Sequence, residues 1–190
     1  MKSRALVLFD IDGTLVRRAG PHHREALVEA VRAITRLDTT TENIPVHGML
    51  DPDILRRMMR DAGASEELIV RQLPAIMRRA QSIYVRRCPD LQDKTCPGVR
   101  RLLYSLQRRG IPTGLVTGNL TRIGWKKMER AGLRHYFHCS RTHGHRTCPP
   151  AGVDPGRRTC FAHWRRTERY HRSPGERRPL DRRPHRHFDA

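Results

Sequence analysis

The feature that most constrains the fold is a short apolar run that stops at two acids. Residues 5–9 are all hydrophobic, as expected of a strand that is buried on both faces of a parallel sheet. Asp10 follows directly, and Asp12, Gly13 and Thr14 continue into a turn. Side chains two residues apart on a strand point to the same side, so both carboxylates are expected near one point. Carboxylates paired in this way can bind a hard divalent cation, and one of them can attack phosphorus while its neighbour transfers protons.

A second apolar strand ends in a polar turn about a hundred residues later. Residues 113–116 lead into Thr117, Gly118 and Asn119, and a helix is expected from about residue 120 to residue 131. The free N–H groups at the start of that helix would favour a bound phosphate. The alternative is that Thr117 serves as an ordinary helix N-cap.

The chain between these strands has the pattern of helices. Apolar residues recur at a spacing of three or four through residues 17–93, which therefore read as a helical insert. Asp51 fits the N-cap of a helix that has Pro52 at its first position, and Pro74 is expected to kink or divide a longer helix. A further helix begins near Gly98 and precedes the second strand. This order predicts an α/β fold, the beginning of a doubly wound, Rossmann-like parallel sheet with an inserted α-helical cap, which binds ligands at the carboxyl ends of its strands.

Asp10 to Thr14 match the Asp-x-Asp-Gly-Thr motif in full, and the chain thereby resembles a phosphatase of the haloacid dehalogenase-like hydrolase superfamily with a helical cap. The resemblance implies that Asp10 is the nucleophile, which forms an aspartyl-phosphate, and that Asp12 is the general acid and base. It also implies Mg²⁺ as the cofactor, bound by Asp10 and Asp12. The acid at position 12 favours phosphoryl transfer over dehalogenation, because dehalogenases of the family lack it. The residues expected to contact the phosphorylated substrate are Gly13, Thr14, Thr117, Gly118 and Asn119.

The resemblance further implies a lysine or arginine beside the nucleophile. Lys126 and Lys127, in the middle of the last predicted helix, are the candidates, and the alternative is that both lie on a solvated helix face. Residues 47–52 resemble a cap loop that usually reads Gly-x-Thr-Asp-Pro in relatives, although Leu50 departs from that pattern. Such a cap would close over the site and select the substrate.

The resemblance ends near Phe137, before the acidic motif that completes the metal site in the family. We therefore expect an α/β core of residues 1–16 and 94–138, a helical cap of residues 17–93, and a basic tail of residues 139–190 that is disordered. The core is then incomplete at its carboxyl end, either truncated or altered by a change of reading frame. With so few carboxylates left for Mg²⁺, we expect weak catalysis or none.

The positive charge of the chain is concentrated in that tail. The chain has 38 Lys and Arg against 19 Asp and Glu, a net charge of +19. Residues 1–138 hold 25 basic and 14 acidic residues, and residues 139–190 hold 13 and 5. The tail has only Val153 and Leu180 as aliphatic residues larger than alanine, so burial cannot offset its ordering entropy. It is either a basic appendage for an anionic partner or the product of a shifted frame in a GC-rich gene, and the 34 Arg against 4 Lys favour the second explanation. Nucleic acid is thus a disfavoured partner.

Other sequence features narrow the class of protein. No segment approaches the roughly 18 apolar residues of a membrane span, and the apolar start is too short for a secretory signal, so we expect a cytoplasmic protein. The five cysteines predict free thiols, and the His and Cys residues of the tail lack the paired spacing of a zinc site. The sequence therefore predicts a magnesium-dependent hydrolase of small phosphomonoesters. The alternatives are a phosphomutase of the same superfamily and a non-catalytic protein that binds phosphate or nucleic acid.

Overall fold

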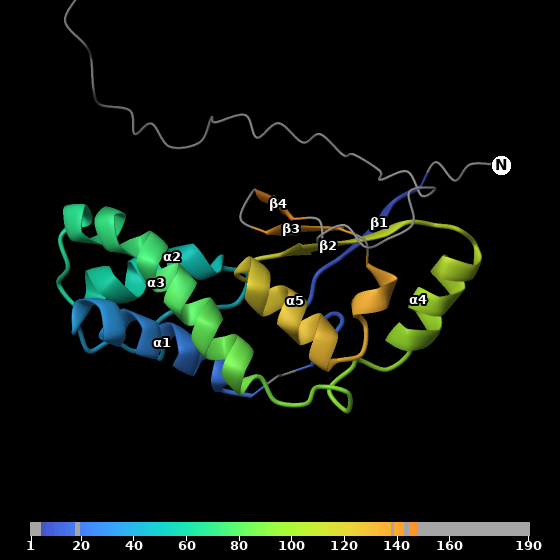
Figure 1. Cartoon of the computed structure of the whole chain (residues 1–190), viewed down its shortest axis with the longest axis horizontal. Coiled ribbons are helices and arrows are strands. Elements are labelled where there is room, and N and C mark those ends of the chain that lie inside the picture. Colours follow the sequence, from blue (N-terminus) through green and yellow to red (C-terminus); the bar gives the residue numbers. More distant parts are fainter. Residues whose placement is uncertain (1–4, 18–19, 138, 143–144, 148–190) are drawn as a thin grey trace, which may run out of the picture. The chain divides into compact units, whose positions relative to one another are not determined.

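The computed structural model describes residues 5–17, 20–137, 139–142 and 145–147 of the 190-residue chain (Figure 1). Its α/β architecture, with helices inserted after the first strand, confirms the fold class predicted from the sequence. The elements in chain order are β1 (Val7–Phe9), α1 (His22–Thr35), α2 (Asp51–Asp61), α3 (Glu66–Arg87), α4 (Val99–Arg108), β2 (Thr113–Thr117), α5 (Thr121–Arg130), the 3-10 helix η1 (Arg134–Tyr136), β3 (Cys139–Thr142) and β4 (His145–Thr147).

The strands form one sheet in the order β1-β2-β3-β4. β1 pairs in parallel with β2, β2 pairs in parallel with β3, and β4 is antiparallel to β3. Both parallel connections step in the same direction across the sheet, and such crossovers are almost always right-handed, so α4 and α5 cover the same face. The carboxyl ends of β1 and β2 consequently meet at one edge, where the predicted site residues lie.

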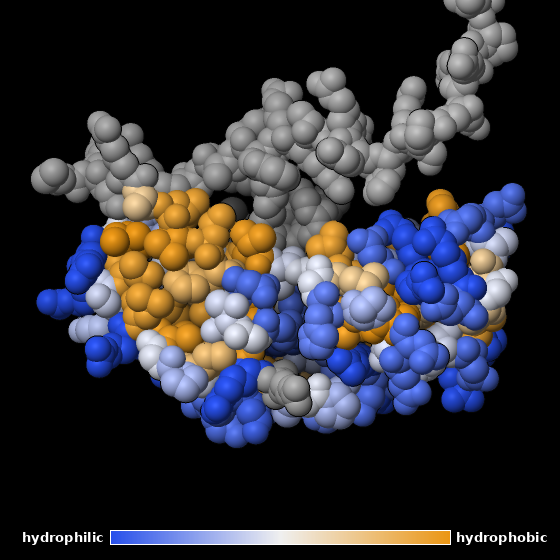
Figure 2. All heavy atoms as spheres, turned by 180° about the vertical axis from the view of Figure 1, so that it is seen from behind, coloured by the Kyte–Doolittle hydropathy of each residue, from blue (hydrophilic) through white to orange (hydrophobic). Residues whose placement is uncertain are grey.

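On β1 and β2, side chains of the other face are exposed, so the prediction that the first strand is buried on both faces is wrong. Phe9 is buried, whereas Leu8 is 53% exposed. Leu8 lies opposite Gly114, and Val116, two residues further on the same face, is 44% exposed. Seen from behind, hydrophobic residues gather on the side of the molecule that holds the sheet (Figure 2). Among the described residues, both helical crossovers lie on the opposite face, which leaves these side chains uncovered.

The sheet extends past residue 138, where the sequence places the end of the core. β3 begins at Cys139 and pairs with β2 from Gly114 to Thr117. The residues from Cys139 to Thr142 include no aliphatic side chain, so the hydrophobic pattern gives no sign of this strand. The rest of the tail from residue 148 onwards, with its acids and most of its His and Cys residues, lies outside the described part of the chain.

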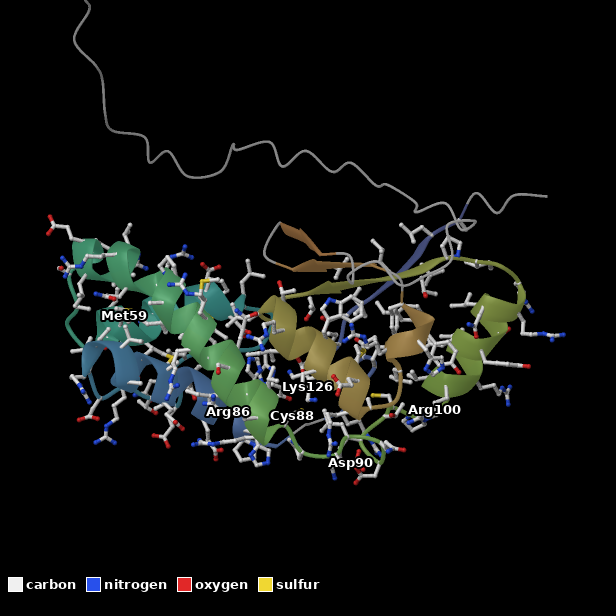
Figure 3. All side chains as sticks on the ribbon, in the orientation of Figure 1. Met59, Arg86, Cys88, Asp90, Arg100 and Lys126 are labelled. Carbon is white, nitrogen blue, oxygen red and sulfur yellow. The ribbon has the colours of Figure 1, made fainter. Side chains whose placement is uncertain are left out.

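Buried apolar side chains form two clusters, and α5 belongs to both. The first, which we call the cap cluster, fills the space among α1, α2 and α3 around residues such as Met59 (Figure 3). The second, the sheet cluster, lies between the strands and helices α4 and α5. Leu120 and Ile123 at the start of α5 join the cap cluster, whereas Met128 and Ala131 at its end join the sheet cluster. One helix thus connects the two hydrophobic cores.

The chain enters and leaves the helical insert side by side. Arg17 N donates to the Lys94 carbonyl at 2.8 Å, and Cys96 N donates to the Leu15 carbonyl at 3.0 Å. Within the insert, α3 is one helix of 22 residues that continues through Pro74. No helix in the described segments is long and apolar enough to cross a membrane.

Candidate active site

The turn after β1 presents the two acids of the first motif. Gly13 adopts φ of 84°, a left-handed conformation that favours glycine, and its N–H donates to the Val16 carbonyl at 2.8 Å. Thr14 is exposed in the same turn. Asp10 and Asp12 therefore lie on a closed turn whose backbone is held by its own hydrogen bonds.

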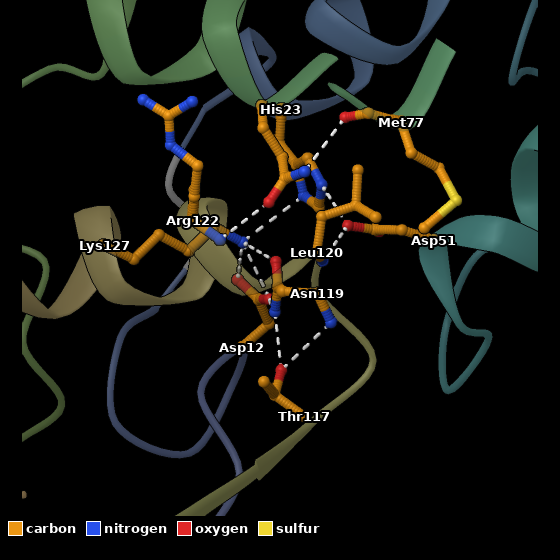
Figure 4. A network of polar contacts seen from close by, with 10 residues as sticks. Asp12, His23, Asp51, Met77, Thr117, Asn119, Leu120, Arg122 and Lys127 are labelled. Carbon is orange, nitrogen blue, oxygen red and sulfur yellow. Dashed lines mark hydrogen bonds and ion pairs between the residues drawn. The ribbon is translucent and has the colours of Figure 1, made fainter. Parts of the chain in front are cut away.

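Two side chains hold the carboxylate of Asp12 (Figure 4). Lys127 Nζ lies 2.7 Å from Asp12 Oδ1 and 2.8 Å from Oδ2, and Asn119 Nδ2 donates to Oδ2 at 2.7 Å. Burial alone would raise the pKa of Asp12, but the charge and hydrogen bonds of Lys127, together with the Asn119 hydrogen bond, outweigh burial and lower that pKa below its ordinary value. Asp12 is thus held in its ionised form.

The structure places the two candidate lysines in different surroundings. The side chain of Lys127 is 1% exposed, whereas Lys126 forms an ion pair with Glu129 on the outer side of α5. Lys127 follows Ile123 and Gly124 by four and three residues, so it occupies the buried stripe of the helix. A lysine in an apolar stripe was therefore the sequence signal that separates Lys127 from its neighbour.

Asn119 is the centre of the polar network that follows β2. Its Nδ2 also donates to Thr117 Oγ1 at 2.6 Å, and its Oδ1 accepts from Lys127 Nζ at 2.8 Å. The structure thereby brings Thr117 and Asn119 next to the acids, as expected of site residues. The amide of Asn119 is already bonded to protein groups, however, so its contact with substrate stays a prediction.

The pKa of Asp10 is raised above its ordinary value, opposite to that of Asp12. Partial burial of the carboxyl is the main cause, and the neighbouring Asp12 carboxylate adds to it. Hydrogen bonds from the backbone of Ile11 and the hydroxyl of Thr117, and the charge of Lys127, oppose the rise without cancelling it. Two carboxyl groups whose pKa values are driven apart are suited to different roles in one reaction.

Gly118 lies against the loop that leads into α2. A Cβ added to Gly118 would lie 2.6 Å from the carbonyl oxygen of Met49, and Asp51 N donates to the Gly118 carbonyl at 2.9 Å. The Asp51 side chain accepts from Leu120 N at 2.6 Å, at the start of α5. The prediction that Asp51 is the N-cap of its own helix is therefore wrong: Leu50 holds that position, and Asp51 caps α5 instead.

A second side chain of the insert also binds the start of α5. Gln81 Oε1, on α3, accepts from Arg122 N at 2.9 Å. Asp51 and Gln81 thus occupy two of the N–H groups that the first turn of a helix leaves unpaired. These two donors are not available for the phosphate that the sequence analysis expected there.

The arrangement of these site residues agrees with the result of comparing the chain with known protein families. A family model described as haloacid dehalogenase-like hydrolase matches residues 5–155. The chain belongs to the haloacid dehalogenase-like hydrolases. The match confirms the membership expected from Asp10 to Thr14, and it identifies the chain as a hydrolase.

Solved structures with the fold of this haloacid dehalogenase-like hydrolase include phosphatases. A "predicted phosphoglycolate phosphatase" from Haemophilus somnus 129PT matches at 19% identity with a TM-score of 0.52, over 80% of this chain and 66% of the other. CbbY from Rhodobacter sphaeroides, in complex with xylulose-1,5-bisphosphate, matches at 18% identity with a TM-score of 0.53, over 72% of this chain and 62% of CbbY. A β-phosphoglucomutase from Clostridium difficile matches at 20% identity with a TM-score of 0.49, over 70% and 58%. The chain spans less than two thirds of the length of each. A search of curated proteins gives no match.

One residue at the site of this hydrolase was missed by sequence reasoning. His23, in the first turn of α1, has Nδ1 3.3 Å from Lys127 Nζ and Nε2 3.0 Å from Asp51 Oδ2. Its ring also packs edge to face with Tyr84, at 5.6 Å between centroids. A histidine near the start of a helix carries no local signal of such contacts, because its partners lie 28 and 104 residues away along the chain.

Proposed function

We propose that this chain hydrolyses small phosphomonoesters with Asp10 as the nucleophile. The observation that carries the proposal is the placement of Asp10 and Asp12 in succession at the end of β1 beside Thr117, with Lys127 bound to Asp12. A single buried ammonium offsets part of the negative charge that an incoming phosphate would meet. Membership of a hydrolase family with phosphatase neighbours supports this reading.

The proposed reaction has two steps. In the first, a carboxylate oxygen of Asp10 attacks phosphorus, the bond from phosphorus to the alcohol oxygen breaks, and Asp12 gives a proton to the leaving alcohol. In the second, water attacks the aspartyl-phosphate, Asp12 accepts a proton from the water, and phosphate leaves with Asp10 restored. The low pKa of Asp12 suits the second step, because a general base must be ionised. It disfavours the first step, in which Asp12 must carry a proton.

Thr117 and the backbone of Gly118 are the proposed phosphoryl ligands beside Asp10, and Gly13 and Thr14 would contribute from the first turn. Thr117 ends β2 at the same edge as Asp10, and its hydroxyl hydrogen-bonds to that carboxyl. A hydroxyl in this position can turn from the carboxylate to a phosphoryl oxygen when substrate binds.

The oxygen donors for Mg²⁺ in the proposed site are the carboxylate of Asp10 and the main-chain carbonyl of Asp12. Mg²⁺ is commonly bound by one or two carboxylates together with substrate phosphate and water, so this donor set fits the ion. When bound, Mg²⁺ would neutralise charge on the phosphoryl oxygens. The described residues contain no group of three or more His, Cys, Asp or Glu side chains that could hold a metal. With a single side-chain carboxylate in this donor set, we infer weak metal binding and slow turnover.

Release of phosphate from p-nitrophenyl phosphate, measured with increasing Mg²⁺, tests the proposal. Asp10→Asn should abolish any turnover, and Asp90→Asn, a change outside the site, should preserve it. The rate should fall on acidification as Asp10 takes up a proton, because a nucleophilic carboxylate must be ionised. Turnover that survives Asp10→Asn would contradict the assignment of the nucleophile. Rapid turnover that saturates at a low Mg²⁺ concentration would contradict the inference of weak metal binding.

A further inference from the structure

The ammonium of Lys127 has an acceptor in the helical insert as well as acceptors in the core. Lys127 Nζ lies within 2.8 Å of Asp12 and Asn119, and 3.3 Å from Nδ1 of His23. An ammonium carries three N–H donors and no acceptor. Because the Lys127 side chain is 1% exposed, protein groups rather than bulk water must accept these hydrogens.

The network assigns the tautomer of His23. Nδ1 faces a group that can only donate, so it must accept, and the ring proton resides on Nε2. That Nε2–H then donates to Asp51 Oδ2 at 3.0 Å. A ring protonated on both nitrogens would place an N–H against the Lys127 ammonium, which is unfavourable.

Asp51 is fixed independently of His23. Its side chain is almost fully buried, and the oxygen that meets His23 also accepts from Leu120 N at 2.6 Å. Its own N–H donates to the Gly118 carbonyl at 2.9 Å. A closed path of hydrogen bonds therefore runs from the start of α5 through Asp51 and His23 back to Lys127 in the middle of α5 (Figure 4).

We propose that His23 and Asp51 are positioning residues, which hold the Lys127 ammonium against Asp12 through the tautomer that Asp51 imposes on His23. Neither needs to touch the substrate. Without the His23 ring, the ammonium keeps its acceptors on Asp12 and Asn119 but loses its contact with the insert, so its position against Asp12 is less constrained. In the intact protein, the insert therefore helps to set the geometry of the acids in addition to covering them. For its effect on turnover, the inference rests on the proposed phosphatase function.

The first test needs no activity. In the ¹⁵N-labelled full chain, the His23 ring, assigned by its loss in His23→Gln, should show the neutral tautomer with the proton on Nε2. The reactivity of Lys127 toward an acetylating reagent, followed by mass spectrometry, should rise roughly tenfold in His23→Ala, in line with the loss of a hydrogen bond to a charged group. His22→Ala is the matched control, because His22 is the neighbouring histidine, its side chain is 39% exposed and it contacts Glu25. Circular dichroism establishes that both variants are folded.

The second test uses turnover of p-nitrophenyl phosphate with Mg²⁺. His23→Ala should lower kcat roughly tenfold and leave KM within about twofold, because the residue acts through Lys127. Asp51→Asn keeps one acceptor oxygen and should retain more activity than Asp51→Ala. A proton on Nδ1, a doubly protonated ring, or equal Lys127 reactivity in the His22 and His23 variants overturns the inference. If the unaltered chain has no turnover, the proposed function fails, while the tautomer and the Lys127 reactivity still decide the positioning role.

Discussion

Replacement of Lys127 by methionine should destabilise the chain by about 1–3 kcal/mol. Methionine preserves most of the apolar stem and removes the ammonium. The side chain of Asp12 is 48% exposed, so water can replace the lost ion pair, which at such exposure contributes at most about 1 kcal/mol. Asn119 is buried, and its Oδ1 would lose the donor at 2.8 Å, at a cost of about 1–3 kcal/mol. Removing the ammonium also removes the free-energy cost of burying its charge, which offsets part of these two losses.

Urea unfolding of the unaltered chain and of Lys127→Met measures this difference, with Lys126→Met as the control. Lys126 pairs only with Glu129 among the described groups, on the outer side of α5, so its loss should change the free energy of unfolding by less than about 0.5 kcal/mol. If the two variants lose equal free energy of unfolding at neutral pH, the assignment of Lys127 as the buried partner of the acids is refuted.

The same comparison has a definite pH dependence. Lys127 lowers the pKa of Asp12 in the folded chain below the unfolded value of about 3.8. The stability that this pair contributes is therefore present above the unfolded pKa and is lost as the pH falls through the folded pKa. The difference in free energy of unfolding between the unaltered chain and Lys127→Met should therefore become smaller as the pH falls toward the folded pKa of Asp12. A gap that stays constant would show that Asp12 is not the group that the ammonium stabilises.

Two further predictions concern packing. Gly118→Ala should lower the thermal unfolding temperature and cost about 1–3 kcal/mol, because its Cβ would lie 2.6 Å from the Met49 carbonyl oxygen; an unchanged melting curve would mean that the loop before α2 yields without cost. The double variant Leu8→Thr and Val116→Thr should reduce the fluorescence of an apolar dye such as ANS and change stability little, since both side chains already face solvent. Undiminished dye binding would place the apolar surface elsewhere.

The strands and acids of the site could be predicted because their signals are local. An apolar run that stops at Asp10 fixes both the strand and the point at which it delivers a carboxylate. The same reasoning placed Thr117 at the end of β2, and parallel pairing then brings the two strand ends together. What local reasoning could not show is the exposed face of β1, because the apolar character of Leu8 does not reveal whether any segment covers it.

The contacts that complete the site are not local, and for that reason they were missed or left open. Lys127 and Lys126 are adjacent in sequence, and the apolar stripe of α5 is the one local signal that separates the buried ammonium from the outer one. Asp51 has the sequence pattern of a cap for its own helix, yet the unpaired N–H of Leu120, 69 residues away, is the group that it satisfies. β3 has no apolar signal at all, because its support comes from backbone pairing with β2.

The double membership of α5 limits how this protein can be recombined with its relatives. Leu120 and Ile123 are buried among the inserted helices, and two N–H groups at the same end of α5 are satisfied by Asp51 and Gln81. A chimera that replaces residues 17–93 alone would place foreign helices against the apolar start of α5. It would also remove the acceptors that Asp51 and Gln81 provide for the two N–H groups there. A working exchange of the insert between relatives would have to transfer the first turn of α5 along with it, so the segment that must be exchanged as a unit is discontinuous in sequence.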